Sequence, residues 1–483
     1  MSNRKILDYS KLELTGLPNK YFYENRERYL AKIRKFKEID YNSILVLAGG
    51  TGIPLYDTDI DMFSFVQESN FFYLSGVKED GLMAILDFTD SQLNLFYQQP
   101  PEDMEIWEKV LTKEELSKRY ELPVHDMENL NSFIKTRDPK FILLLEGIND
   151  YSNLPVKSTL DFKDEYSYLN ARIFHSDLYY EILKDTRLIK ADYEIELKRY
   201  INEITIEAHL QIMSNIKPGL NERDLEMIFY NYLYRKYYTR LWAYPCIGGA
   251  NKNAATLHYE VNDQILQNGG LFLADMGVRF CNYTSDITMT IPINGKFTQK
   301  QKQIYDIVLL SNREVQKIIK PGVEYTDMDK LSKIIILQEL QKLGMLNSGF
   351  SLEEMYQKNI YKLFMAHGLG HSVGLDVHDI GHIIKYKKSL QMEEGMIFTV
   401  EPGIYFVEFV LQKAFNDEDQ KKYLNVNMIK GYLDFGGVRI EDDVYVTKDG
   451  CVNLTSRIPR TTEEIENFMS NNNIYMKSKE KKK

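Results

Sequence analysis

The sequence predicts a protein of the α/β (α+β) class, with an N-terminal mixed-sheet domain and a larger C-terminal domain made of two related halves. The chain has 483 residues, which is more than one ordinary hydrophobic core accommodates, so two domains are expected. Up to about residue 186, short apolar runs alternate with polar segments of helical spacing. Beyond that point a Lys-Pro-Gly breaker occurs twice in similar surroundings.

The N-terminal domain is expected to cover residues 1–186. Its apolar runs predict strands at 43–49, 70–76, 82–88, 93–98 and 140–147. The charged segment 101–120 has the spacing of a helix. Strands that alternate with helices favour a mixed sheet, and this part of the sequence contains no cluster of residues typical of catalysis.

The C-terminal domain is expected to cover residues 187–470 and to contain an internal duplication. A long amphipathic helix is predicted to begin near Asp192, a suitable N-cap, and to stop before a Lys-Pro-Gly breaker. Segments 216–228 and 319–331 both open with Ile-Lys-Pro-Gly and continue as acidic, helical sequence. The shared context favours two related halves over chance and predicts a site between them. The polar tail 471–483 is predicted to be disordered.

Composition and charge limit the classes of function. Hydrophobic residues make up 44% and charged residues 27%, as in ordinary globular proteins, and the net charge of −10 disfavours a nucleic-acid partner. No apolar run is long enough for a membrane span, and the charged start does not resemble a secretory signal. Three scattered cysteines predict reduced thiols rather than disulfides. We therefore expect a cytoplasmic protein without a membrane partner.

The histidines are concentrated in one short stretch. Of eight histidines, four lie between residues 367 and 382, and the sequence there reads HGLGHSVGLDVHD from 367 to 379. The interleaved glycines make a regular helix improbable, so this is not a helical zinc motif. Glycines also let a backbone pass close to a ligand or metal. A single histidine is usually a surface or core residue, but this cluster indicates a site.

Two aspartates lie in a predicted hairpin, residues 271–293, with its turn near Arg279–Asn282. Asp275 stands within an apolar strand, where an unpaired carboxylate is costly, and the returning strand can bring Asp286 close to it. Facing carboxylates repel each other unless a cation lies between them or one holds a proton. The alternative is exposure on a solvent face, which the apolar flanking residues disfavour.

Two glutamates end apolar runs further along the chain. Glu401 precedes Pro402-Gly403, and Glu441 follows Val438-Arg439-Ile440. Each alone is weak evidence, and a solvated acidic turn is a reasonable alternative for Glu441. Together, four carboxylates and one imidazole suit two divalent cations. Oxygen-rich ligation favours manganese, with cobalt or iron as substitutes, over a thiolate zinc site.

These segments together resemble the pita-bread metallopeptidases, specifically the group of Xaa-Pro dipeptidase (prolidase) and aminopeptidase P. The resemblance begins with FSFVQESNFFYLSGVKEDG (63–81), which is similar to the non-catalytic N-terminal domain of the group. It continues through LHYEVND, ADMG, SDIT, the histidine segment, TVEPGIYF, GGVRIEDD and IPRTTEEIE, and so covers nearly the whole chain. Within the group, eukaryotic prolidase is the most similar.

The resemblance implies roles for individual residues. Asp275 would bind one Mn²⁺, His371 and Glu401 the other, and Asp286 and Glu441 would bridge the pair. The residues implied to line the substrate site are His258, His367 and His378. Tyr244 and Arg439 match positions that support the ligands. Trp107 matches an aromatic residue that reaches the neighbouring subunit's site, which implies a homodimer.

The implied reaction is hydrolysis of Xaa-Pro dipeptides with release of free proline, in which Glu401 shuttles a proton. Xaa-Pro aminopeptidase activity on longer peptides is the alternative, and a catalytically inactive binding protein is a further one. The chain departs from the group before Glu401, where the segment 382–396 is short and Lys387 stands in place of an arginine expected to bind the substrate carboxylate. Lysine lacks the bidentate geometry of arginine.

Overall fold

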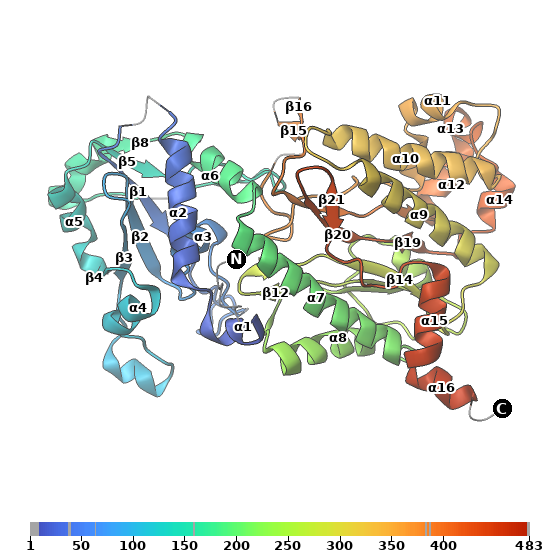
Figure 1. Cartoon of the computed structure of the whole chain (residues 1–483), viewed down its shortest axis with the longest axis horizontal. Helices are drawn as coiled ribbons and strands as arrows, with labels where there is room; N and C mark the ends of the chain where they lie inside the picture. Colours follow the sequence, from blue (N-terminus) through green and yellow to red (C-terminus); the bar gives the residue numbers. More distant parts are fainter. Residues whose placement is uncertain are drawn as a thin grey trace. The chain divides into compact units, whose positions relative to one another are not determined.

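The computed structural model describes residues 9–36, 40–62, 64–157, 160–381, 384–385 and 388–480 (Figure 1). The chain forms two compact units. The N-terminal unit spans Thr15–Tyr193, and the C-terminal unit starts at Glu194 and includes a short N-terminal segment that ends at Leu14. Each unit is described separately below.

The N-terminal unit is built on a six-stranded sheet in the order β4-β3-β2-β1-β5-β8. β1 pairs antiparallel with β2 and parallel with β5, so the sheet is mixed, as the sequence predicted. Its strands are β1 Ser43–Ala48, β2 Leu82–Asp87, β3 Leu93–Tyr97, β4 Val124–Asp126, β5 Phe141–Leu144 and β8 Ile173–Phe174. Its main helices are α2 Asn19–Ile33, α3 Ser69–Ser75, α4 Lys113–Tyr120, α5 Leu130–Arg137 and α6 Leu178–Leu188.

The strand predicted at 70–76 is wrong, because this segment forms the buried helix α3. The Glu68 side chain accepts the backbone N–H of Phe71 and caps the first turn. Gly76 has φ 77° and ends the helix in the left-handed region, where its N–H donates to the Phe72 carbonyl oxygen. In a fully buried segment apolar residues face every side, so the hydrophobic periodicity cannot distinguish a strand from a helix. Here only the flanking capping residues indicate a helix.

The C-terminal unit consists of two successive halves, each with two long helices followed by a three-stranded antiparallel sheet. In the view of Figure 1 the helix pairs α7–α8 and α9–α10 lie on either side of the strands. The first half contains α7 Asp192–Asn215, α8 Glu222–Tyr237, β10 Ile247–Ala250, β11 Leu271–Asp275 and β14 Thr288–Pro292. The second half contains α9 Gln299–Ile318, α10 Tyr325–Lys342, β17 Ile397–Val400, β20 Asp442–Val446 and β21 Cys451–Asn453. None of the described helices is long and apolar enough to cross a membrane.

The two Lys-Pro-Gly turns have the same hydrogen-bond geometry. Gly219 and Gly322 both have φ 89°, a conformation that glycine adopts without strain. The Gly219 N–H donates to the Leu266 carbonyl oxygen at 2.9 Å, and the Gly322 N–H donates to the Met392 carbonyl oxygen at 2.8 Å. In return, the Leu266 N–H donates to the Leu220 carbonyl oxygen, and the Met392 N–H donates to the Val323 carbonyl oxygen. The predicted duplication is therefore visible at the level of single backbone bonds.

The C-terminal segment differs from the expected disordered tail. Helix α15 continues to Asn472, and α16 spans Ile474–Glu480. Between them Asn473 is buried, and its side-chain amide donates to the carbonyl oxygens of Met213 and Ile216 at 2.9 and 2.8 Å. These contacts satisfy orphaned carbonyl groups at the end of α7. The polar composition of this segment gives no sign of the tertiary hydrogen bonds made by Asn473.

Candidate active site

The two aspartates are positioned by the predicted hairpin. β11 pairs antiparallel with β14, and Asp275 lies opposite Thr288. Asp286 precedes β14 by two residues, and the following residue, Ile287, accepts the backbone N–H of Met276. The turn is longer than one hairpin, because β12 (Val278–Phe280) and β13 (Tyr283–Thr284) form a separate small sheet with β9 (Leu241–Trp242). Both aspartates are buried.

The glycine-rich histidine segment runs beside β17. The His371 backbone N–H donates to Thr399 Oγ1 at 3.0 Å, and the Glu401 N–H donates to the Leu369 carbonyl oxygen at 2.9 Å. A Cβ at Gly370 would lie 2.0 Å from the Thr399 carbonyl oxygen, so no other residue fits there without displacement. The glycines thus allow the backbone approach that places His371 next to Glu401.

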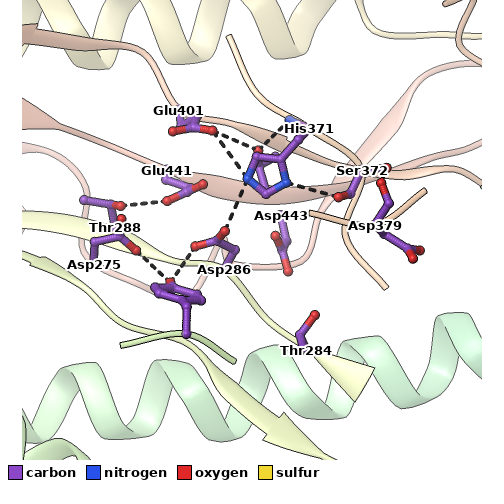
Figure 2. A network of polar contacts seen from close by, with 12 residues as sticks. Asp275, Thr284, Asp286, Thr288, His371, Ser372, Asp379, Glu401, Glu441 and Asp443 are labelled. Carbon is purple, nitrogen blue, oxygen red and sulfur yellow. Dashed lines mark hydrogen bonds and ion pairs between the residues drawn. The ribbon is translucent and has the colours of Figure 1, made fainter. Parts of the chain in front are cut away.

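Four of the five predicted metal ligands converge (Figure 2). Ligand atoms of Asp286, His371 and Glu441 lie within 4.8 Å of one another, and all three residues are buried. His371 Nε2 is 3.3 Å from Asp286 Oδ2 and 3.5 Å from Glu401 Oε1. Glu401 follows β17 directly, and Glu441 precedes β20, which pairs with β17. This pairing brings the two glutamates of the second half together.

The tautomer of His371 leaves one nitrogen for a metal. Its Nδ1 is 3.0 Å from the Ser372 carbonyl oxygen, which can only accept a hydrogen bond. The neutral ring therefore carries its proton on Nδ1 and directs the Nε2 lone pair at the carboxylates. A second hydrogen bond of this kind commonly orients metal-binding histidines.

Asp275, the fifth predicted ligand, is linked to the others through Tyr244 and Arg439. The Tyr244 hydroxyl oxygen lies 2.6 Å from Asp275 Oδ1 and 2.5 Å from Asp286 Oδ1. A hydroxyl has one proton, so Tyr244 donates to one of the two carboxylates at a time. Arg439 Nη2 donates to Asp275 Oδ2 at 2.6 Å, while its Nε donates to Thr288 Oγ1 at 3.1 Å. The structure thus brings both supporting residues to the site.

The buried carboxylates bind protons more tightly than carboxylates in water. Burial raises the pKa of Asp286 to about 6 and that of Glu401 to about 7. Burial, followed by repulsion from Asp286 and the other carboxylates, raises the pKa of Glu441 well above its usual value. Burial alone lowers the pKa of His371, but the hydrogen bond to Asp286 and the charge of Glu401 outweigh it and raise this pKa to about 9. The protein therefore concentrates negative charge at a place that favours a cation.

The structure reveals two supporting residues that the sequence interpretation missed. Thr288 Oγ1 donates to Glu441 Oε2 at 2.6 Å. The Tyr405 hydroxyl accepts a hydrogen bond from Arg439 Nη1 at 3.0 Å and lies 2.9 Å from His367 Nε2. Thr288 could have been found from its register opposite Asp275, whereas no sequence signal indicates where the Tyr405 hydroxyl lies.

The three predicted substrate-site histidines differ in their burial and in their distance from the cluster. The His378 ring is 4.3 Å from the His371 ring, between centroids. Burial, and then the positive charges of His371 and His258, lower the pKa of His378 to about 4. Burial and the charge of Arg439 lower the pKa of His367 to about 4 as well. His258 is exposed in the turn after the short helix Asn251–Ala255, within electrostatic reach of both.

Two further predicted substrate-binding residues lie outside the described part of the C-terminal unit. Trp107 follows the short helix Glu102–Ile106 of the N-terminal unit, and its side chain is 81% exposed. Such exposure is unusual for tryptophan and leaves the ring free to contact another molecule. Lys387 lies outside the described residues, as does His382.

Replacing Gly370 with alanine is expected to disturb the site through the backbone. The added Cβ meets the Thr399 carbonyl oxygen and must push the His371 segment away from β17. Overpacking of this kind typically costs about 1–3 kcal/mol of stability. Differential scanning calorimetry of Gly370→Ala should show a lower melting temperature than that of Gly450→Ala, whose Cβ meets nothing closer than 3.9 Å. Equal melting temperatures would contradict this account of the segment.

Comparison with known proteins agrees with this geometry. Residues 178–448 match the family described as metallopeptidase family M24, and residues 22–139 match the aminopeptidase P N-terminal domain. The chain is 36% identical over 477 residues to Xaa-Pro dipeptidase of Homo sapiens, covering 95% of each chain. It is 33% identical over 468 residues to a probable Xaa-Pro aminopeptidase of Verticillium alfalfae, covering 94% of this chain and 98% of the relative.

Solved structures share the fold across both units. The aminopeptidase PepP of Pseudomonas aeruginosa superposes with a TM-score of 0.79 at 28% identity, covering 96% of this chain and 100% of its own. Aminopeptidase P of E. coli with the inhibitor Pro-Leu gives a TM-score of 0.77 at 26% identity, with coverage of 94% and 99%. The mixed N-terminal sheet and the duplicated C-terminal unit are thus those of the pita-bread enzymes, and the chain belongs to metallopeptidase family M24.

Proposed function

We propose that this protein is an Xaa-Pro dipeptidase that hydrolyses the imide bond of dipeptides ending in proline and releases free proline. The observation that carries the proposal is the buried convergence of Asp286, His371 and Glu441, with Glu401 beside them. It occurs in a chain whose similarity to Xaa-Pro dipeptidase extends over 95% of its length. We further propose a cytoplasmic location.

We propose that two Mn²⁺ ions occupy this site, with Co²⁺ or Fe²⁺ as substitutes. Asp275 would hold one, His371 and Glu401 the other, and Asp286 and Glu441 would bridge them. The donors fit, since they are carboxylate oxygens and one imidazole nitrogen, a set suited to such ions. A thiolate site is disfavoured, because the nearby Cys246 is buried and its Sγ hydrogen-bonds the Tyr230 hydroxyl at 2.8 Å. Burial of several carboxylates without enough internal cations is costly unless metal ions compensate their charge.

When bound, such a metal pair lowers the pKa of a water molecule and polarises the scissile carbonyl. Glu401 would take the proton from the attacking water and deliver it to the departing proline nitrogen. Without a proton the departing nitrogen would leave as an unstable amide anion, so this delivered proton is required for proline to leave as an amine.

The histidines would stabilise the negative oxygen that develops on the scissile carbonyl. With a pKa near 4, His378 stays neutral at pH 7 and offers an N–H donor without adding charge. His258, on its exposed turn, would provide a second donor. His367 also stays neutral, and its Nε2 is already engaged by the Tyr405 hydroxyl. We therefore propose that His367 shapes the substrate site, together with Arg439, Tyr405 and Tyr244.

A dipeptidase must also recognise a free C-terminal carboxylate. Lys387 is the proposed cation for this purpose, and a lysine supplies a point charge where arginine would bind in a bidentate manner. We propose in addition that the enzyme is a homodimer in which Trp107 reaches the neighbouring subunit's substrate site. Its 81% exposure is consistent with such a role.

Binding of Mn²⁺ is expected to release protons and to weaken as the pH falls. In the metal-free protein, Glu401 titrates with a pKa of about 7, Asp286 with about 6 and His371 with about 9. Ligands must lose their protons to bind metal, so apparent affinity should drop steadily from pH 8 to pH 5. Calorimetric titration at pH 7 in buffers of different ionisation enthalpy should detect more than one proton released per chain. A pH-independent affinity would contradict the proposed ligands.

The choice between dipeptidase and aminopeptidase requires a substrate test. The similarity to fungal relatives named as probable Xaa-Pro aminopeptidases supports the second candidate, cleavage of longer Xaa-Pro peptides. We expect the manganese-loaded protein to hydrolyse Gly-Pro with a higher kcat/KM than a tripeptide Gly-Pro-Gly. Equal or faster turnover of the tripeptide would favour the aminopeptidase, and absence of turnover on both peptides with absence of bound metal would favour an inactive binding protein.

A further inference from the structure

A cavity lies on the C-terminal unit, behind the strands that carry the candidate metal ligands. Its volume is about 590 Å³, and its walls come from α9, β20, β21, the loop after β21 and α15. Part of the lining is apolar, with contributions from Leu309, Ile458 and Phe468. Small-molecule sites generally have volumes of about 300–1,000 Å³ and combine apolar walls with a few polar groups.

Three arginines give this cavity a positive character in a protein whose net charge is −10. Arg313 is exposed and makes no hydrogen bond or ion pair with any residue in the described part of the chain. Arg457 pairs with Glu203 at 2.9 Å and with Glu207 at 3.9 Å, and its side chain remains half exposed. Arg460 is buried and bound to Asp442 at 2.6 Å, but its Nε has no acceptor among the described residues. Unused guanidinium donors in a cavity favour an anionic ligand.

The acidic residues of the cavity are already engaged. Asp442 accepts hydrogen bonds from Arg460, from Thr455 Oγ1 at 2.6 Å and from Gln316 Nε2 at 3.0 Å. Glu464 Oε2 accepts the backbone N–H groups of Arg460 and Thr461 at the start of α15. The backbone hydrogen bond from Thr461, and to a lesser extent the charge of Arg313, lowers the pKa of Glu464, but neither carboxylate forms a hydrogen bond or ion pair with Arg313.

The inner wall of the cavity holds the backbone of both metal-site glutamates. Asn312 Nδ2 donates to the carbonyl oxygen of Val400 at 2.9 Å and to that of Ile440 at 3.4 Å. These are the residues immediately before Glu401 and Glu441. Arg460 reaches the Glu441 carbonyl oxygen and also donates to the Thr288 carbonyl oxygen at 2.8 Å. A ligand that displaces Asn312 or Arg460 would break these hydrogen bonds to the backbone beside the glutamates.

We propose that this cavity is an effector site for a small organic anion bearing a phosphate or carboxylate group. Arg313 and Arg457 bind the anionic group, for which the planar guanidinium is geometrically suited. The apolar part of the ligand lies against Ile458 and Phe468. Occupancy changes the positions of Glu401 and Glu441 through Asn312 and Arg460 and so alters turnover. Only this effect on turnover rests on the proposed function; ligand binding does not.

Binding is tested by isothermal titration calorimetry on the full-length, manganese-loaded protein. Adenosine monophosphate represents phosphate ligands and glutarate represents carboxylate ligands. We expect saturable binding of at least one of them, weakened about tenfold or more in Arg313→Gln. Ser456→Trp keeps every arginine but fills the cavity from an exposed lining position and should abolish binding. Arg235→Gln, on the exposed surface of α8, is the charge-matched control and should bind as the wild type does.

Two results would overturn the site itself. One is the absence of saturable binding of either compound, and the other is equal weakening in Arg313→Gln and Arg235→Gln, which indicates general attraction of anions. Circular dichroism and melting temperature confirm that each variant is folded.

The effector role is tested by the kcat of Gly-Pro hydrolysis with and without the bound compound. We expect a change of about fivefold or more in the wild type and in Arg235→Gln, and none in Ser456→Trp. Binding without a change in kcat overturns the effector role. A change that persists in Ser456→Trp also overturns it, because the compound then acts by withdrawing metal from solution.

Discussion

Replacing Asp286 with asparagine is expected to abolish Gly-Pro hydrolysis and to deplete both metals. Asparagine keeps the shape of the side chain but removes the negative charge that the two ions would share. Two-metal activation supplies several kcal/mol of transition-state stabilisation, so kcat should fall about 1,000-fold or more. Steady-state kinetics and metal analysis of the purified variant by mass spectrometry measure the two effects.

The same substitution distinguishes loss of metal from loss of folding. Burial and repulsion from Asp275 disfavour the Asp286 charge, so the metal-free variant should melt no lower than the metal-free wild type. Manganese should raise the melting temperature of the wild type but not that of the variant. Asp263→Asn, at an exposed position of the same unit, serves as the control and should behave as wild type. Full activity or full metal content in Asp286→Asn would exclude a bridging role.

Replacing Glu401 with glutamine is expected to remove proton transfer while retaining an oxygen that can contact a metal. General acid–base catalysis contributes about 10²–10⁴-fold, so kcat should decrease by that amount while KM changes little. The amide cannot accept the proton of the attacking water or deliver one to the proline nitrogen. Stopped assays with Gly-Pro over a range of manganese concentrations separate the loss of transfer from weakened metal binding.

The control for this substitution comes from the turn that precedes the same strand. Glu394 is exposed just before β17, and Glu394→Gln should retain wild-type kcat. If saturating manganese restored Glu401→Gln to within about tenfold of wild type, Glu401 would be a ligand only, and the proton would have another carrier.

The sequence indicated most of the site because its signals are local. An aspartate within an apolar strand, as at Asp275, is costly enough to be noticed in a single sequence. The glycines around His371 indicated that the backbone there passes close to another group. In the structure, the Gly370 backbone packs against Thr399. The repeated Lys-Pro-Gly turns predicted the duplication, because proline fixes its own φ and glycine permits the positive φ of the turn.

What the sequence did not indicate depends on tertiary packing. Residues 70–76 are buried on all sides, so their apolar sequence has no helical or strand period, and only the caps at Glu68 and Gly76 define α3. Tyr405 is one of 34 tyrosines, and its place between Arg439 and His367 follows from the pairing of β18 (Gly403–Tyr405) with β19 (Gly437–Arg439). Likewise, Asn473 is anchored by carbonyl groups at residues 213 and 216, far away in sequence.

The division of the proposed ligands between two halves determines when the candidate site can form during synthesis. Asp275 and Asp286 belong to the first half, whereas His371, Glu401 and Glu441 belong to the second. At a ribosomal speed of about 5–20 residues per second, the 155 residues from 287 to 441 take roughly 8–31 s to emerge. During that interval the first half carries two aspartates without their partners. If these residues bind metal as proposed, we expect metal capture late in biogenesis, after the first half has folded.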